Sequence, residues 1–231
     1  KDLFRVGFIQ NYPQFGNIQD NLRRIEGMLD GKRADLFVLP ELFSTGYRFK
    51  KMDEARQYAE PIPGGVVTNF LISLAKKINT YFIAGLVEID DDRIYNSSIT
   101  VGPEGFIGRY RKIHLFDTEK ACFHTGTEAP PVFNLHGTKV GVMICFDWRF
   151  PEIARSLALN GAEIIAHPSN LVLPHCPQAM ITRCLENRVY AITANRVGNE
   201  NRVPDEMLHF IGQSQVVDPD GNILIRASEI E

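Results

Sequence analysis

Short apolar runs alternate with longer amphipathic segments along the chain, which is the pattern of an α/β protein. The first run, "RVGFIQ" at residues 5–10, predicts a strand. Residues 17–34 predict an amphipathic helix with Asn17 as its N-cap. Its apolar positions at helical spacing are Ile18, Leu22, Ile25 and Leu29. The next run, "DLFVLPE" at 35–41, predicts a strand that stops at Pro40.

The rest of the chain continues this alternation. We expect helices over residues 64–79, 151–162 and 176–188, strands over 81–89, 96–102, 105–111, 139–145 and 188–196, and a hairpin over 214–226. The run "KVGVMIC" at 139–145 is almost continuously apolar, which is typical of a strand covered on both faces. The segments "GPEG" and "DPDGN" predict tight turns.

Two segments share one order of features: a helix end, an acidic residue, an apolar strand, a proline and a polar loop. They are "GKRADLFVLPELF" at residues 31–43 and "NGAEIIAHPSNLV" at 160–172. The likeness indicates two similar halves packed face to face, although a chance resemblance of two strand exits would look the same. Because no Gly/Ser-rich linker or low-complexity segment interrupts the chain, we expect one domain over residues 1–231.

Composition narrows the class of protein. With 231 residues, of which 44% are hydrophobic and 23% charged, the chain can form one sizeable core. The net charge is -3 and the basic residues are scattered, so we expect neither nucleic acid nor an anionic membrane as a partner. No apolar run reaches the roughly eighteen residues of a spanning helix, and "KDLFRVGFIQ" lacks the features of a secretory signal, so we expect a cytoplasmic protein. The four cysteines form no Cys-x-x-Cys pair, which favours free thiols.

Three reactive side chains follow predicted strands and precede aromatic-rich loops. They are Glu41 in "VLPELF", Lys112 in "RYRKIHLF" and Cys145 in "GVMICFDWRFPE". The carboxyl ends of strands in α/β sheets converge on one crevice, so the three side chains can meet. A carboxylate can take a thiol proton, and an ammonium can stabilise both the thiolate and an oxyanion. Taken singly, each residue has a common structural role, as core packing for the cysteine and as an ion pair for the other two.

These segments also carry a resemblance to a known family. "FVLPELFSTGY", "GRYRKIHLF" and "GVMICFDWRFPE", in this order, resemble the three signature blocks of the nitrilase superfamily of carbon-nitrogen hydrolases. The segments "HLFDTEKACFHTG", "LENRVYAITANRVG" and "FIGQSQVVDPDGNIL" extend the likeness over residues 6–224. The resemblance implies a four-layer α-β-β-α sandwich that pairs into at least a homodimer. Family members usually continue past "RASEIE" with a further segment near the dimer interface.

The resemblance implies a role for each site residue. Glu41 is expected to be the general base, Lys112 the electrostatic stabiliser and Cys145 the nucleophile. Glu119 in "FDTEK" resembles the second glutamate of the family, which positions the lysine and the substrate's amino group; its structural alternative is a solvated loop carboxylate. The backbone N–H of Phe146 would complete the oxyanion hole. The implied reaction forms a thioester with loss of ammonia or an amine, and water then hydrolyses the thioester. Neither a metal nor an organic cofactor is required.

The substrate is expected to be small. Aromatic residues near the three catalytic candidates suggest a pocket walled by rings, namely Phe43, Tyr47, Phe116 and Trp148. Each ring has core packing as its alternative role. Arg149 is the one obvious partner for a substrate carboxylate, and pairing with Glu152 is its alternative; carbamoyl-amino-acid hydrolases of the family have two adjacent arginines here. We therefore predict small aliphatic amides, then nitriles, then N-carbamoyl amino acids.

Other functional classes fit the sequence less well. A Cys-His protease would need His114 or His167 beside Cys145, without the local motif of such families. Zinc binding would draw on four residues whose spacing matches no standard ligand pair, namely Cys122, His124, His175 and Cys176. "GQSQV" is not the Gly-x-Ser-x-Gly motif of a serine hydrolase. A non-catalytic scaffold that keeps the fold is the remaining alternative.

Overall fold

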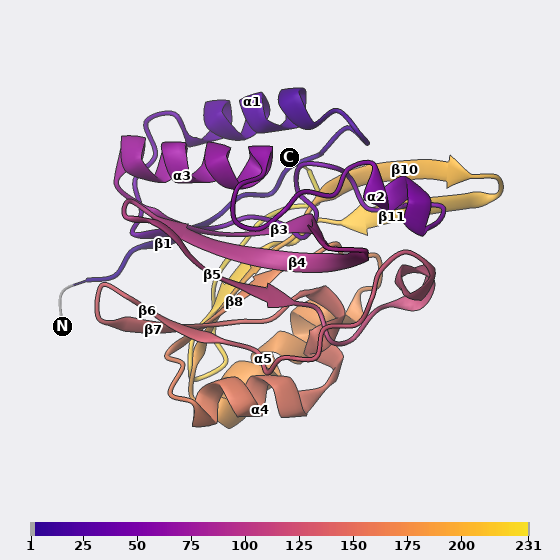
Figure 1. Ribbon diagram of the computed structural model, residues 1–231. Helices are drawn as coiled ribbons and strands as arrows, with labels where there is room; N and C mark the ends of the chain where they lie inside the picture. Colours follow the sequence, from indigo (N-terminus) through magenta and orange to yellow (C-terminus); the bar gives the residue numbers. More distant parts are fainter. Residues whose placement is uncertain (1–2, 231) are drawn as a thin grey trace.

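The chain folds into four layers, with two β-sheets inside and helices on both outer faces (Figure 1). The structure, a computed structural model, describes residues 3–230; Lys1, Asp2 and Glu231, which belong to the expected domain span, lie outside the described residues. The longer helices are α1 (Ile18–Leu29), α3 (Val66–Ile78), α4 (Pro151–Leu159) and α5 (His175–Asn187). Helices α1 and α3 cover the first sheet, and α4 and α5 cover the second. The predicted α-β-β-α sandwich is thus confirmed.

The first sheet comes from the N-terminal half of the chain. Its strands are β1 (Val6–Phe8), β2 (Leu36–Val38), β3 (Tyr81–Asp90), β4 (Arg93–Gly102) and β5 (Gly105–Arg111), in the order β1-β2-β3-β4-β5. Strands β1, β2 and β3 are parallel, β4 is antiparallel to β3, and β5 is antiparallel to β4. Strands β2 and β5 therefore run in the same direction, and both end at the same edge of the sheet.

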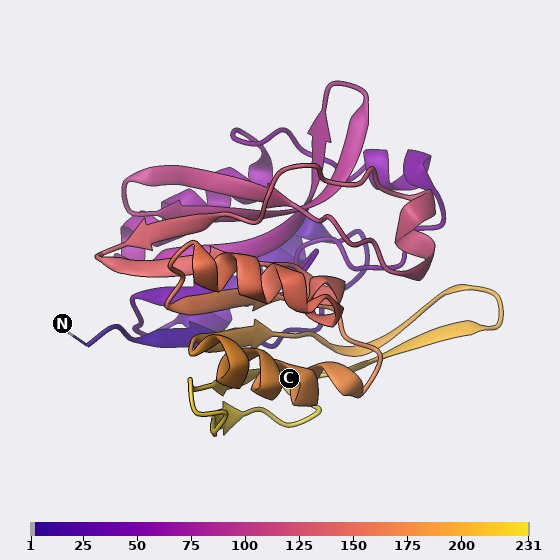
Figure 2. The same ribbon diagram turned by 90° about the horizontal axis from the view of Figure 1, so that it is seen from below.

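The second sheet comes from the C-terminal half (Figure 2). Its strands are β6 (Val132–Leu135), β7 (Thr138–Val142), β8 (Ile164–Pro168), β9 (Tyr190–Ala194), β12 (Gln215–Val217) and β13 (Ile223–Arg226), in the order β13-β12-β9-β8-β7-β6. Strands β7, β8 and β9 are parallel, and β12 and β13 alternate in direction after them. The series from β7 to β13 thus repeats the first sheet, and the two similar segments of the sequence hold equivalent places at β2 and β8.

Successive side chains along a strand point to opposite faces of its sheet and so join two different hydrophobic clusters. In β2, Leu36 and Val38 face the second sheet and join the cluster between the sheets, whereas Phe37 joins the cluster under α1 and α3. This period of two is the geometry of an extended strand buried on both faces.

Within residues 3–230, no helix is long and apolar enough to cross a membrane.

Several details differ from the sequence-based prediction: among them, the strand expected over 139–145 ends at Val142, and strand β6 was not expected. Helix α1 ends at Leu29, and its N-cap Asn17 donates its side-chain amide to Asp20 instead of accepting from the backbone. The short helix α2 (Met52–Arg56) was not expected. A hairpin of β10 (Val197–Val203) and β11 (Glu206–Ile211) also went unpredicted, and it extends away from the layered body (Figures 1 and 2). The hairpin sequence is mostly polar and shows no clear alternation, so it carried no strand signal.

Candidate active site

The ends of three strands bring the catalytic candidates together. Glu41 follows β2, Lys112 directly follows β5, and Cys145 follows β7. Lys112 Nζ lies 2.6 Å from Glu41 Oε1 and 2.8 Å from Glu119 Oε1. Lys112 and Glu41 are completely buried, and Glu119 and Cys145 nearly so. The first sheet thus supplies a carboxylate and an ammonium, and the second supplies the thiol.

The charges of this cluster depend on one another. Burial alone would lower the pKa of Lys112, but the Glu119 and Glu41 carboxylates outweigh it and raise that pKa, so the ammonium stays charged. Burial raises the pKa of Glu119 to about 7 against the opposing pull of Lys112. Burial, and then the Glu41 charge, raise the pKa of the Cys145 thiol well above its usual range. The thiol is therefore protonated at neutral pH and needs a base to become a nucleophile.

Glu119 is held on both carboxylate oxygens. Besides Lys112, Oε1 accepts a hydrogen bond from the Tyr47 hydroxyl at 2.7 Å, and Oε2 accepts one from the Phe116 N–H at 3.1 Å. Because only 3% of its surface is exposed, Glu119 is not a solvated loop carboxylate. It forms one cluster with Lys112 and Glu41.

Two asparagines that the sequence analysis did not single out hold Glu41. Asn96, in β4, donates its side-chain amide to Glu41 Oε1 at 2.7 Å. Asn170, after β8, donates its side-chain amide to the main-chain carbonyl of Glu41 at 2.8 Å. A polar residue within a buried strand was the one available signal for Asn96, and it is ambiguous because such residues often only satisfy backbone groups.

The backbone at Cys145 is in a strained turn. Cys145 has φ +40° and begins a short 3-10 turn, Cys145–Arg149. Asp147 accepts hydrogen bonds from the Ile144 N–H and from the Tyr110 hydroxyl, both at 2.9 Å. His167 Nε2 lies 2.8 Å from the Cys145 carbonyl oxygen, which can only accept, so Nε2 carries the proton. A positive φ in a side-chain-bearing residue is maintained only by such surrounding contacts.

The two histidines considered for a Cys-His protease bind other groups. His167 contacts the carbonyl of Cys145 rather than its sulfur, and burial lowers the pKa of His167 to about 4. His114 Nδ1 lies 2.8 Å from Asp147 Oδ1. The geometry therefore does not favour a thiol-imidazole pair.

A small cavity of about 20 Å³ lies beside Cys145, enough for about one water molecule. It is lined by Cys145, by three rings and by residues 170–173. The rings are Phe116, Phe146 and Trp148. Phe116 and Trp148 are two of the four rings expected at the pocket, whereas Phe146 was expected to contribute its backbone N–H.

The other predicted binding residues lie elsewhere. Phe43 is buried in the core under α1 and α3 and does not line this cavity. Tyr47 packs in a separate cluster with Phe210 and reaches the site through its hydroxyl. Arg149 is exposed, and its guanidinium lies 6.0 Å from the ring of Trp148. An exposed arginine at this place does not provide a buried partner for a substrate carboxylate.

The four residues considered for zinc do not come together. The Cys122 thiol faces the carbonyl of Phe49, whereas Cys176 is buried on α5 in the core between the layers. Across residues 3–230, no group of three or more His, Cys, Asp or Glu side chains is placed to hold a metal ion.

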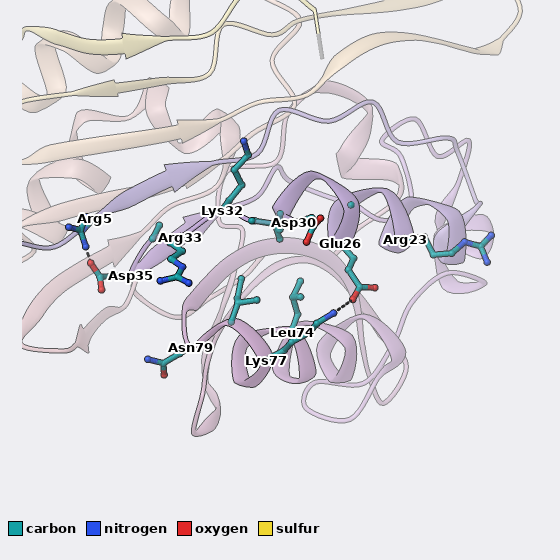
Figure 3. Close-up of a pocket in the computed structure, with 15 residues that line it drawn as sticks. Arg5, Arg23, Glu26, Asp30, Lys32, Arg33, Asp35, Leu74, Lys77 and Asn79 are labelled. Atoms are coloured by element: carbon teal, nitrogen blue, oxygen red, sulfur yellow. Dashed lines mark hydrogen bonds and ion pairs between the residues drawn. The ribbon is translucent and has the colours of Figure 1, made fainter.

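A larger hollow of about 1020 Å³ opens between the ends of α1 and α3 (Figure 3). Charged side chains of both signs surround it, and Lys77 pairs with Glu26 across the two helices at 2.7 Å. None of the catalytic candidates lines it. The hollow is thus a charged surface feature separate from the buried cluster.

Comparisons with known proteins show the family and the fold of the chain. The carbon-nitrogen hydrolase family model matches residues 5–231. A nitrilase of Pyrococcus abyssi is 48% identical over 99% of this chain and 87% of its own length, and an (R)-stereoselective amidase of Pseudomonas sp. is 35% identical over 86% and 70%. The crystal structure of Saccharomyces cerevisiae Nit3, a member of the nitrilase superfamily, superposes with a TM-score of 0.85 at 30% identity, covering 99% of this chain and 87% of that one. The chain belongs to the carbon-nitrogen hydrolase family.

Proposed function

We propose that this carbon-nitrogen hydrolase acts on small aliphatic amides through a thioester on Cys145 and releases ammonia. The main support for this proposal is the buried cluster in which Lys112 bridges Glu41 and Glu119 next to the thiol. A buried base that can take the proton of a thiol and a fixed cation that can stabilise an oxyanion are groups that acyl transfer through cysteine requires.

Glu41 is suited to the role of general base because its two oxygens differ. Oε1 accepts hydrogen bonds from Lys112 and Asn96, whereas Oε2 is buried and, among the described residues, has no hydrogen-bond partner. We propose that Oε2 accepts the proton of the Cys145 thiol. The resulting thiolate attacks the amide carbon, and Lys112 with the Phe146 N–H stabilises the oxyanion.

The same carboxyl group completes the cycle. Protonated Glu41 returns its proton to the departing nitrogen, ammonia leaves, and a thioester remains on Cys145. Water then gives a proton to Glu41 and attacks the thioester. Collapse of this second intermediate expels the sulfur, which regains the proton, and the carboxylic acid is released. Glu119 keeps Lys112 in place through both halves of the reaction.

The side chains around Cys145 favour a short, uncharged acyl group. The cavity is narrow and walled by three rings and by leucine and valine side chains, and Arg149 is exposed beside it. These features favour aliphatic amides over N-carbamoyl amino acids, which present a carboxylate. Nitriles are the second candidate because the same thiol can attack a nitrile carbon, and one relative is named a nitrilase.

The proposal extends to the whole protein. We infer one carbon-nitrogen hydrolase domain over the chain, and at least a homodimer, because several large apolar side chains are exposed on the α4–α5 layer and on β13. They are Leu159, Leu185, Ile223, Leu224 and Ile225.

We also infer a cytoplasmic location. The four cysteines are all free thiols, which fits a reducing compartment; they are Cys122, Cys145, Cys176 and Cys184.

Ammonia release from a panel of small amides and nitriles tests the proposal. We expect Cys145→Ala to lose at least about a thousandfold in rate. The matched control is Cys184→Ala, which removes another buried thiol far along α5 and should keep its activity. Iodoacetamide labelling with peptide mapping should place inactivation on Cys145. No ammonia from any substrate would instead identify a non-catalytic scaffold, and inactivation that tracked Cys122, Cys176 or Cys184 would remove Cys145 from its role.

A further inference from the structure

Asn170 has a buried oxygen that the protein leaves without a partner. The residue is 3% exposed and lines the cavity next to Cys145. Its side-chain nitrogen donates to the main-chain carbonyl of Glu41 at 2.8 Å. Its side-chain oxygen, Oδ1, is fully covered and accepts no hydrogen bond from residues 3–230. Buried polar atoms are normally paired, so an unpaired acceptor at a cavity wall points to a ligand.

The orientation of the Asn170 amide is fixed by chemistry. Nitrogen and oxygen of an asparagine side chain are easily exchanged in a structure. Here the contact atom is the carbonyl oxygen of Glu41, which can only accept, so the Asn170 nitrogen must face it. The oxygen is therefore the atom that remains for the cavity.

Asn170 lies next to the reacting atoms. Asn170 and Cys145 line the same cavity, and the backbone of Asn170 lies close enough to the Cys145 thiol to favour its thiolate, so the residue lies beside the sulfur that would attack. The substrate's carbonyl oxygen needs donors and would turn toward Lys112. An acceptor such as Asn170 Oδ1 would repel a developing oxyanion, and it is suited instead to the N–H on the other side of the carbonyl carbon.

We propose that Asn170 Oδ1 accepts a hydrogen bond from the N–H of a primary amide and makes the site selective for substrates with that donor. The inference rests on the proposed amide hydrolysis and deepens it. An ester or a nitrile has no hydrogen on the leaving heteroatom, so it would leave the buried oxygen unpaired. A site built around such a hydrogen bond discriminates strongly against analogues that lack the donor.

A matched pair of substrates isolates this bond. Butyramide and methyl butyrate share the acyl group and the thioester intermediate, and only the amide has an N–H donor. Asn170→Leu also removes the bond to the Glu41 carbonyl, which lowers turnover of both substrates, so the ratio is the readout: we expect kcat/KM to fall at least about tenfold more for butyramide than for methyl butyrate. Asn170→Ala should shift the amide-to-ester ratio of kcat/KM in the same direction. It provides the test if the leucine variant does not fold.

The control variant is Asn187→Leu. Asn187, at the end of α5, is also buried with an unpartnered side-chain oxygen, but it lies outside the cavity. Its substitution should leave the amide-to-ester ratio unchanged.

Two outcomes would overturn the inference alone. An equal fall for amide and ester would mean that Asn170 acts only through its bond to Glu41, which both substrates need. An unchanged ratio with normal amide turnover would mean that the oxygen has no role in selection. A wild-type protein that cleaves neither amides nor nitriles would instead refute the proposed function, which the ammonia assay registers independently.

Discussion

At the scale of single residues, Glu119 shows how burial and charge oppose each other in this site. Its carboxyl is buried beside Lys112, yet its pKa is raised to about 7 because loss of solvation outweighs the attraction of the ammonium. The group therefore ionises within the physiological range. The two ends of its carboxylate are occupied by Tyr47 and by the backbone of Phe116, so its position does not depend on solvent.

This pKa predicts a pH dependence of stability. The ordinary value of the Glu119 pKa is 4.5 and its value in the folded protein is about 7, so the folded state holds the proton more tightly. The associated stability is present below pH 4.5 and is lost as the pH rises through 7. Relative to Glu119→Gln, which does not ionise, the wild-type free energy of unfolding should fall by roughly 2–3 kcal/mol between pH 5 and pH 8.

Urea unfolding of both proteins at the two pH values measures this difference. Loss of individual hydrogen bonds in the glutamine variant gives an offset that does not change with pH, and other titrating groups cancel between the two proteins. A difference that stays constant from pH 5 to pH 8, or changes with the opposite sign, would show that Glu119 does not titrate as described.

Some residues of the site could be predicted from the sequence and others could not. Glu41, Lys112 and Cys145 could be singled out because each stands after an apolar strand, where side chains converge at one edge of a sheet. Asn170 follows the same kind of strand, but an asparagine in a loop has too many local roles to indicate one. Phe43 looked like a pocket residue, although a ring next to a buried strand faces either side with equal ease, and here it faces α1 and α3.

At the scale of elements, the β10–β11 hairpin connects the outside of the molecule to the site. Glu200 in β10 is buried and accepts the N–H groups of Tyr47 at 3.0 Å and of Arg48 at 2.7 Å. Arg196, which directly precedes β10, forms an ion pair with Glu200 and stacks on Phe210. The hairpin thus fixes the loop that carries Tyr47, and Tyr47 holds Glu119.

Loss of the Glu200 carboxylate should lower both the stability of the protein and its turnover. Glu200→Gln leaves the buried guanidinium of Arg196 without its charge partner, so we expect a loss of about 3 kcal/mol in unfolding free energy. We also expect kcat to fall about tenfold with a smaller change in KM, because Tyr47 no longer holds Glu119 firmly. Thermal unfolding and steady-state kinetics on butyramide measure the two effects.

The hairpin offers its own control. Glu206 in β11 pairs with Arg48, and its side chain is 48% exposed. Glu206→Gln should therefore change stability by less than about 1 kcal/mol and leave kcat unaltered. Equal effects of the two substitutions would mean that the link through Glu200 has no special role.

Most elements could be predicted because burial imposes a period on the sequence. Strands such as β2, β3 and β8 are apolar runs and the four longer helices have apolar stripes, so local pattern and tertiary environment agree. The hairpin could not be predicted because its stability comes from distant partners. Arg202 in β10, for example, stacks on Phe15 and pairs with Glu54. Contacts between residues so far apart in the chain leave no periodic signal in either segment.

At the scale of the whole molecule, the two outer layers differ in what they expose. On the α4–α5 layer, Leu185 is 52% exposed and lies near the exposed strand β13, where Ile223, Leu224 and Ile225 also face outward. On the opposite layer, Val66 at the start of α3 is 57% exposed. Contiguous exposed apolar surface marks an interface more often than a single exposed residue does.

The proposed dimer can be tested by placing a charge on each layer. Leu185→Glu should shift the protein toward monomer in size-exclusion chromatography with light scattering, because it puts a carboxylate into an apolar contact. Val66→Glu, the matched substitution on the other layer, should leave the mass unchanged. A wild-type protein that is monomeric at micromolar concentration would refute the dimer, and dissociation by Val66→Glu alone would move the interface to the α1–α3 layer.

The repeated strand order has a practical consequence. The first sheet is complete by residue 111 and the second begins at residue 132, with an exposed connection at 127–129 between them. Glu41 and Lys112 come with the first stretch of chain, and Cys145 and Asn170 with the second. A cut in the connection would separate the proposed base from the proposed nucleophile, so turnover would require the two fragments to reassemble. The fold is therefore a natural scaffold for a split-enzyme complementation reporter, in which two fused proteins that bind each other restore hydrolysis.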